Sequence, residues 1–234
     1  MTIFLILLAG ALAGIQNALA GGGSFITLPA LILAGLNPLE ANITSTVALF
    51  PGQVTTGLAN RQLISGTSQL SFRILFMLSV IGGGLGALLL LYTPATVFAR
   101  LVPWLVLFAT LVFAWGNFVR KPASSNAAHL GGGATALIQF CIAIYGGYFG
   151  GGIGFLMMAA LSLAGMQTRG AAATKNVLAS VMNAAAVLLF VFSAAVRWKE
   201  AAVLGVSAIV GGLIGAKMLS HFPENVLRIV VVVI

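Results

Sequence analysis

The stretches Gly21-Gly22-Gly23-Ser24-Phe25 and Gly150-Gly151-Gly152-Ile153-Gly154-Phe155 each place a run of three glycines inside an apolar segment. Glycine costs a helix interior about 1 kcal/mol relative to alanine, so three in succession should end one helix and start another. Inside a bilayer, an interrupted helix is tolerated only where protein buries it or water reaches it. Paired interruptions in two similar halves are the best sequence indication of a secondary transporter's substrate site. The two glycine runs therefore predict a ligand site where two helices break.

The composition is that of an integral membrane protein. Of 234 residues, 60% are hydrophobic and only 6% are charged, and the mean hydropathy is +1.13. Soluble domains carry about 25% charged residues. The net charge of +8 comes mostly from Lys and Arg at the ends of apolar segments, as the positive-inside bias produces, so it does not indicate nucleic-acid binding. The first segment lacks a basic start and is expected to be a retained span rather than a cleaved signal peptide. We expect an all-α membrane protein.

The apolar segments form two similar halves. The first half predicts helices over Thr2–Ala20, Ser24–Leu36, Glu40–Arg61, Ser71–Tyr92 and Ala95–Phe118. A shift of 130 residues places positions 21–53 on the second half with 11 identities and no gap, and a shift of 129 places Pro94 on Pro223. We therefore expect a first repeat over 1–118, a polar linker over 119–130 and a second repeat over 131–234. Only 11 residues follow Pro223, against 24 in the segment after Pro94, so the last helix is expected to be truncated.

The order of these segments also predicts how the halves are oriented. Five segments per half is an odd number, so the second repeat should be inverted relative to the first. The short segment after each glycine run is too short to cross a bilayer comfortably, at about 1.5 Å per residue. Some segments are therefore either spanning or re-entrant.

The duplicated motifs resemble those of the sulfite exporter TauE/SafE family of membrane permeases. The resemblance rests on the glycine runs, on Leu33-Ala34-Gly35 with Leu163-Ala164-Gly165, and on the polar helices at Ala41–Thr46 and Ala171–Asn176. It covers nearly the whole chain, although Met158-Ala159 stands where the first half has Leu28-Pro29. It implies a multi-pass protein of the bacterial inner membrane that moves small sulfur-containing anions such as sulfite or sulfonates.

The predicted anion site combines helix N-termini with polar side chains. A helix that starts after a glycine run directs free N–H groups and a positive dipole end into the break. Hydroxyls and amides of the next helix would complete the site. The candidate substrate-binding residues are Gly22, Gly23, Ser24, Thr44, Ser45, Gln53, Gly152, Ile153, Gly154, Thr174, Lys175, Asn176 and Asn183. The alternatives are close helix packing for the glycines and interhelical hydrogen bonds for the polar side chains.

Lys175 is the most informative single candidate. It follows Arg169 by six residues, a little under two helical turns, so it is either an interface anchor or a ligand for the anion. Three further amides, Gln16, Asn17 and Gln139, lie within apolar segments just before the breaks, where packing and binding roles are equally compatible with the sequence. If a proton couples to transport, the titratable groups available are Glu40, Glu200, Glu224, His129 and His221, all near segment ends.

These features favour a secondary transporter that works by alternating access. The alternatives that stay open are an anion channel and a carrier of another small organic anion. The sequence contains no aspartate, no HExxH spacing and no P-loop pattern, so we expect neither an enzyme nor a bound cofactor or metal. The expected partners are the small anion, the lipid bilayer and, where transport is coupled, a proton or Na⁺.

Overall fold

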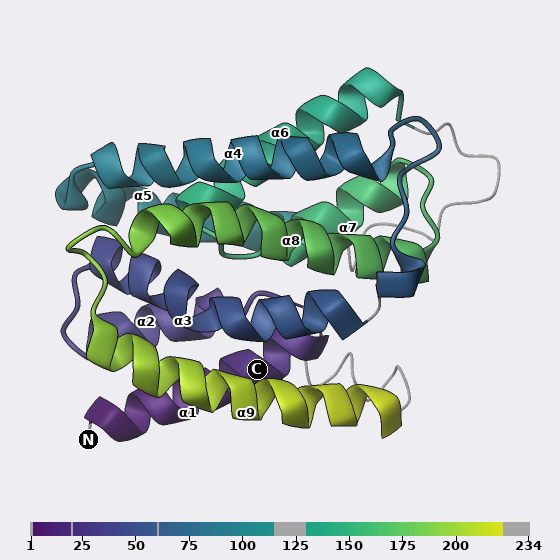
Figure 1. The fold of residues 1–234 in the computed structure, drawn as a ribbon. Coiled ribbons are helices and arrows are strands. Elements are labelled where there is room, and N and C mark those ends of the chain that lie inside the picture. Colours follow the sequence, from purple (N-terminus) through teal and green to yellow (C-terminus); the bar gives the residue numbers. More distant parts are fainter. Residues whose placement is uncertain (1, 20, 60, 115–129, 222–234) are drawn as a thin grey trace.

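The computed structural model describes residues 2–19, 21–59, 61–114 and 130–221, which form nine α-helices and one 3-10 helix without a strand (Figure 1). The helices are α1 (Thr2–Leu19), α2 (Ser24–Leu33), α3 (Pro38–Ala59), α4 (Phe72–Tyr92), α5 (Ala95–Ala114), α6 (Gly132–Tyr148), α7 (Ile153–Leu163), α8 (Thr168–Phe190) and α9 (Trp198–His221), and the 3-10 helix η1 is Arg61–Leu63. The all-helical prediction is confirmed. Except for Leu130, the predicted linker lies outside the described residues, as does the predicted truncated helix after Pro223.

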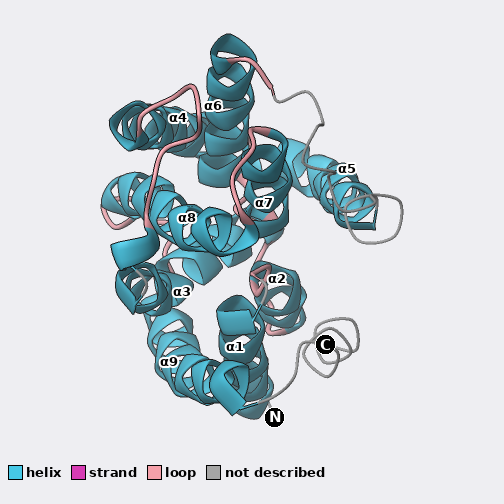
Figure 2. Ribbon diagram, turned by 90° about the vertical axis from the view of Figure 1, so that its right-hand side faces the viewer, coloured by secondary structure: helices cyan, strands magenta, loops and turns pink. Residues whose placement is uncertain are grey.

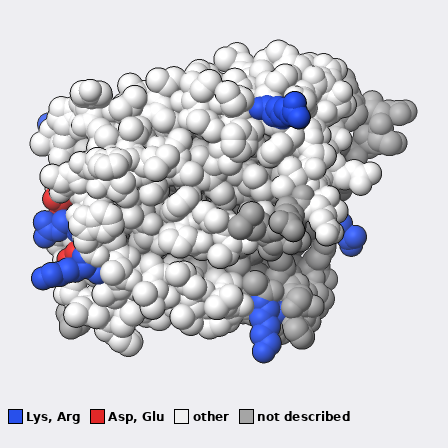
Figure 3. Space-filling model, viewed as in Figure 1, with Lys and Arg blue, Asp and Glu red and all other residues white. Residues whose placement is uncertain are grey.

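Four of the described helices are long and apolar enough to cross a membrane. They are α4, α5 and parts of α8 and α9, at Phe72–Tyr92, Ala95–Val112, Arg169–Phe190 and Trp198–Gly215. Figure 3 shows charged side chains toward the two ends of the helices on the face in view, with an uncharged band between them. That distribution matches a bilayer whose hydrocarbon core excludes charge.

The glycine runs divide two pairs of helices into hairpins. α1 and α2 are separated by Gly21–Gly23, and α6 and α7 by Gly150–Gly152. At 1.5 Å per residue, α2 and α7 are about 15 Å long, half the thickness of the hydrocarbon core. In Figure 1 the α1–α2 hairpin begins and ends at the left of the molecule, whereas the α6–α7 hairpin begins and ends at the right. The short segments therefore reach only partway through the helix bundle.

The sequence also determines how both short helices end. Leu33-Ala34-Gly35 follows α2, and Leu163-Ala164-Gly165 follows α7. Gly35 has φ +100° and Gly165 has φ +87°, a left-handed conformation that favours glycine. The amide of Leu36 donates to the carbonyl of Leu31, a hydrogen bond typical of a glycine-terminated helix.

The two halves are interleaved rather than side by side (Figure 2). α1 packs along α9, α4 packs along α6, and α3 contacts α8 in the middle. Glycines allow the two long helix pairs to come close, because a β-carbon on Gly211 of α9 would collide with the carbonyl of Ala11, and one on Gly86 of α4 with the carbonyl of Ile144. Small residues at helix contacts are the usual means of close packing in membranes. This pairing brings the two glycine runs together at the centre.

Candidate functional site

The two breaks face each other. A β-carbon on Gly21 would lie 3.5 Å from Cα of Gly154 and 3.9 Å from Nζ of Lys175. Gly21, Gly22, Gly150 and Gly152 all have φ between +74° and +92°. Side chains rarely adopt this conformation, so the glycines are required for the turn as well as for the close approach. The sequence-based expectation of opened backbone at both runs matches these angles.

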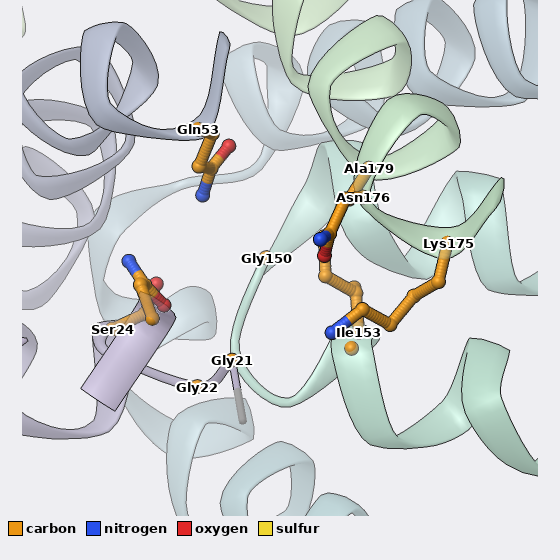
Figure 4. Close-up of a pocket in the computed structure, with 11 residues that line it drawn as sticks. Gly21, Gly22, Ser24, Gln53, Gly150, Ile153, Lys175, Asn176 and Ala179 are labelled. Atoms are coloured by element: carbon orange, nitrogen blue, oxygen red, sulfur yellow. The ribbon is translucent and has the colours of Figure 1, made fainter. Parts of the chain in front are cut away.

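A cavity of about 40 Å³ lies between the breaks. Its lining comes from α1, from both breaks, from the first residues of α2 and α7, and from α3 and α8: Asn17, Gly21, Gly22, Ser24, Gln53, Gly150, Ile153, Gly154, Lys175, Asn176 and Ala179. In Figure 4 the side chains of Ser24 and Gln53 lie on one side of this space, and those of Lys175 and Asn176 on the other. A space of this volume holds a few water-sized groups, which suits a small ion.

Backbone amides at the helix starts are available to a ligand. Phe25, Ile26 and Thr27 in α2, and Phe155 and Leu156 in α7, already donate to carbonyls in their own break. The amides that precede them, at Ser24, Ile153 and Gly154, have no acceptor within the described part of the chain, and all three residues line the cavity. Free N–H groups at two helix N-termini create a positive potential that attracts an anion.

Lys175 adds the amino group of a buried lysine to these donors. It lies in α8 within a candidate membrane span, is 8% exposed, and lines the cavity. Among the described residues, no carboxylate or other acceptor pairs with its ammonium group. A buried unpaired charge is costly, so a lysine in this position requires a counter-charge or water. The interface-anchor alternative fits poorly, because the side chain extends toward the breaks (Figure 4).

Seven of the predicted substrate-binding residues line the cavity, and six do not. Those in the lining are Gly22, Ser24, Gln53, Ile153, Gly154, Lys175 and Asn176, and those outside it are Gly23, Thr44, Ser45, Gly152, Thr174 and Asn183. Gly23 lies beside the cavity, but its amide donates to Oδ1 of Asn17 at 2.8 Å. The hydroxyls of Ser45 and Thr27 bond to each other. Asn183 donates to Oε1 of Gln53 and thus contacts the cavity lining without being part of it.

The hydroxyls of Thr44 and Thr174 instead hold connecting segments in place by hydrogen bonds. The hydroxyl of Thr44 accepts a hydrogen bond from the amide of Arg197 at 3.1 Å, just before α9. The hydroxyl of Thr174 accepts from the amide of Ser65 at 3.2 Å, in the connection to α4. Both threonines are fully buried, and each holds a connection that belongs to the other half. Glu40 lies near the same connection as Thr44, with its carboxylate 3.9 Å from the Arg197 guanidinium.

Four lining residues were absent from the predicted set: Asn17, Gly21, Gly150 and Ala179. The sequence is equally compatible with a packing and a binding role for Asn17, and its hydrogen bond from the Gly23 amide shows that it also caps the first break. Gly21 and Gly150 belong to the predicted breaks. Ala179 could have been predicted from the sequence, since it lies four residues after Lys175 and therefore on the same face of α8. The other two amides differ: Gln16 is buried outside the lining, and Gln139 donates to Ser79 at 2.9 Å.

Comparison with known proteins identifies the family to which the chain belongs. The family model described as sulfite exporter TauE/SafE matches residues 6–234. The chain is 29% identical over 230 residues to a probable membrane transporter protein of Haemophilus influenzae, covering 96% of the chain and 88% of that protein. It is 27% identical over 227 residues to the probable membrane transporter protein YfcA of Escherichia coli K12, covering 95% and 82%. A probable membrane transporter protein of Sinorhizobium, ORF9, is 28% identical over 233 residues, covering 97% and 86%.

No solved structure matches the chain. The family match extends over both halves and includes both glycine runs, so it spans the whole of the cavity described above. The relatives are bacterial membrane transporters, and the apolar helices are those of a multi-pass protein. The chain therefore belongs to the sulfite exporter TauE/SafE family of membrane transporters and is a multi-pass protein of the bacterial inner membrane.

Proposed function

We propose that this transporter carries small sulfur-containing oxyanions, such as sulfite or sulfonates, and binds them in the cavity between the two breaks. The observation that carries the proposal is the ammonium group of Lys175, which is buried beside unbonded backbone amides with no described partner. An oxyanion would accept from several of these donors at once, and charge-assisted bonds of this kind are about twice as strong as neutral ones. The printed description of the family, a sulfite exporter, supports the same class of substrate.

The proposed mechanism is alternating access by two inverted repeats. Its support is the arrangement of the hairpins, which begin and end at opposite sides of the molecule (Figure 1), together with the pairing of α1 with α9 and of α6 with α4. The anion would stay near the middle while the halves move around it. The scarcity of carboxylates disfavours a cation as the transported species, since Glu40 and Glu200 are the only two in the described residues.

A counterflow panel in proteoliposomes tests the substrate class. The reconstituted full chain is loaded with sulfite, sulfate, taurine, sulfoacetate or chloride, and exchange is measured at two pH values. We expect saturable exchange of sulfite or a sulfonate and little exchange of chloride. Flux that does not saturate would indicate a channel. Exchange of none of the sulfur anions would refute the proposed substrate class.

A further inference from the structure

Two phenylalanines make reciprocal contacts across the breaks. A β-carbon on Gly22 would lie 3.1 Å from Cε2 of Phe155, and one on Gly152 would lie 3.0 Å from Cζ of Phe25. The repeat relates these residues pairwise, since a shift of 130 places Gly22 on Gly152 and Phe25 on Phe155. Each half therefore places one ring against the left-handed glycine of the other half. No side chain larger than hydrogen fits beneath either ring without displacing it.

Both rings are next to the amides proposed to bind the anion. Phe25 is the second residue of α2 and directly follows Ser24, and Phe155 is the third residue of α7 and directly follows Gly154. Neither ring lines the cavity. The rings therefore contact the breaks from outside the space that the anion would occupy.

One residue of α5 contacts the same glycine as the Phe25 ring. A β-carbon on Gly152 would also lie 2.9 Å from Cβ of Ala109, a residue of α5 that is 1% exposed. Only 11% of the α5 span is buried, so α5 lies at the periphery of the described structure. The Gly152 break is therefore enclosed both by the Phe25 ring and by Ala109 of this peripheral helix. A rigid aromatic ring packed against the break limits how far the break can shift, because a close-packed interior leaves no free space beside it.

We propose that Phe25 and Phe155 are positioning residues that set the spacing of the two helix N-termini and thereby limit the size of the bound anion. The proposal rests on the proposed anion site. The backbone hydrogen bonds of each break stay within its own half, as those from Gly21 to Gln16 and from Phe155 to Gly152 do. One side-chain hydrogen bond crosses between the halves just before the second break, from the side-chain amide of Asn42 to the carbonyl of Tyr148. The ring-on-glycine contacts connect one break to the other. A smaller side chain at either position would let the N-termini separate and enlarge the cavity.

A chain-length series of alkanesulfonates tests this role. Methane-, ethane-, propane- and butanesulfonate compete with sulfite counterflow by the full-length wild type, Phe25→Leu and Phe155→Leu. We expect each leucine variant to shift the propane-to-methane preference toward the longer anion by about 16-fold, because propanesulfonate has two more methylenes and each newly accommodated methylene changes affinity about fourfold. Phe25→Tyr keeps the ring and should keep the wild-type preference. Phe192→Leu, at a position that is 88% exposed, is the matched control.

The outcomes separate this role from a purely structural one. Weaker binding of all four sulfonates by the same factor, or an unchanged preference in both leucine variants, overturns the positioning role. Phe25→Met and Phe155→Met also remove the ring, but the flexible methionine side chain adapts to irregular gaps, so they provide the same test where a leucine variant does not fold. Failure of the wild type to exchange sulfite or any sulfonate refutes the proposed function itself, whereas an unchanged preference with intact exchange refutes only the positioning role.

Discussion

Replacing Lys175 by methionine should weaken anion binding and at the same time stabilise the anion-free protein. Methionine keeps the unbranched shape of the side chain and removes the charge. Lys175 is 8% exposed and its ammonium group has no partner among the described residues, so the substitution breaks no ion pair in the structure. The two effects therefore have opposite signs, which a lysine with an ordinary packing role would not produce.

The magnitudes follow from the surroundings of the ammonium group. A hydrogen bond to a charged group contributes about 1.5–3 kcal/mol, and each 1.4 kcal/mol is a factor of ten in affinity. Lys175→Met should therefore raise the Kd for sulfite or a sulfonate by about 10- to 100-fold. The effective cost of a buried charge is several kcal/mol, and a domain of this size gains about 2–4 °C in Tm per kcal/mol. The anion-free variant should melt several degrees higher than the wild type.

Thermal melting of the purified protein with and without anion measures both effects in one assay, because a ligand stabilises the folded state by RT ln(1 + [L]/Kd). Lys199→Met is the matched control, since Lys199 is exposed at the start of α9. It should change neither the anion-free Tm nor the shift caused by the anion. A Lys175→Met protein that binds with wild-type affinity, or that melts lower without anion, would refute our account of this residue.

Three further substitutions test other parts of the structure. Asn17→Asp keeps the side-chain oxygen that caps the first break but adds a negative charge to the cavity. The repulsion between this carboxylate and a bound anion is about 3 kcal/mol at about 5 Å and an effective dielectric of about 20. Titration calorimetry should therefore show that anion affinity falls more than about 100-fold. Thr44→Val should lower stability by about 1 kcal/mol in denaturant titrations and leave anion affinity unchanged. Gly86→Ala should lower the Tm, whereas Gly84→Ala, with open space around it, should leave it unchanged or raise it.

The helices were predictable because their boundaries depend on local signals. Glycine runs, prolines and the Leu-Ala-Gly helix ends fixed most predicted ends to within a few residues, as at Tyr92, where the prediction and α4 agree. α2 was predicted to end at Leu36 and ends at Leu33, because Gly35 turns the chain earlier. α5 is described to Ala114, and the rest of the predicted segment lies outside the described residues.

The site was predictable only in part, because membership of the cavity depends on tertiary contacts. The break residues and Lys175 follow from the sequence, since glycine runs and an intramembrane cation are local features. Thr44 and Thr174 have the same side-chain chemistry as a ligand-binding residue, yet their hydroxyls hold connections that are more than 100 residues away in sequence. Nothing in the local sequence distinguishes a threonine that binds an anion from one whose hydroxyl holds a connecting segment by a hydrogen bond.

The repeat also explains why the candidate site has a single charge. Ser45 occupies the position in α3 that Lys175 occupies in α8, 130 residues later. Ser45 is held by the hydroxyl of Thr27, whose own counterpart in the second half is Met157. Methionine has no O–H or N–H donor and is only a weak acceptor, so the side chain at 175 is not held in the same way. In the predicted repeat, the two halves therefore supply two sets of backbone donors, while this one difference between them leaves the charge on one side of the cavity.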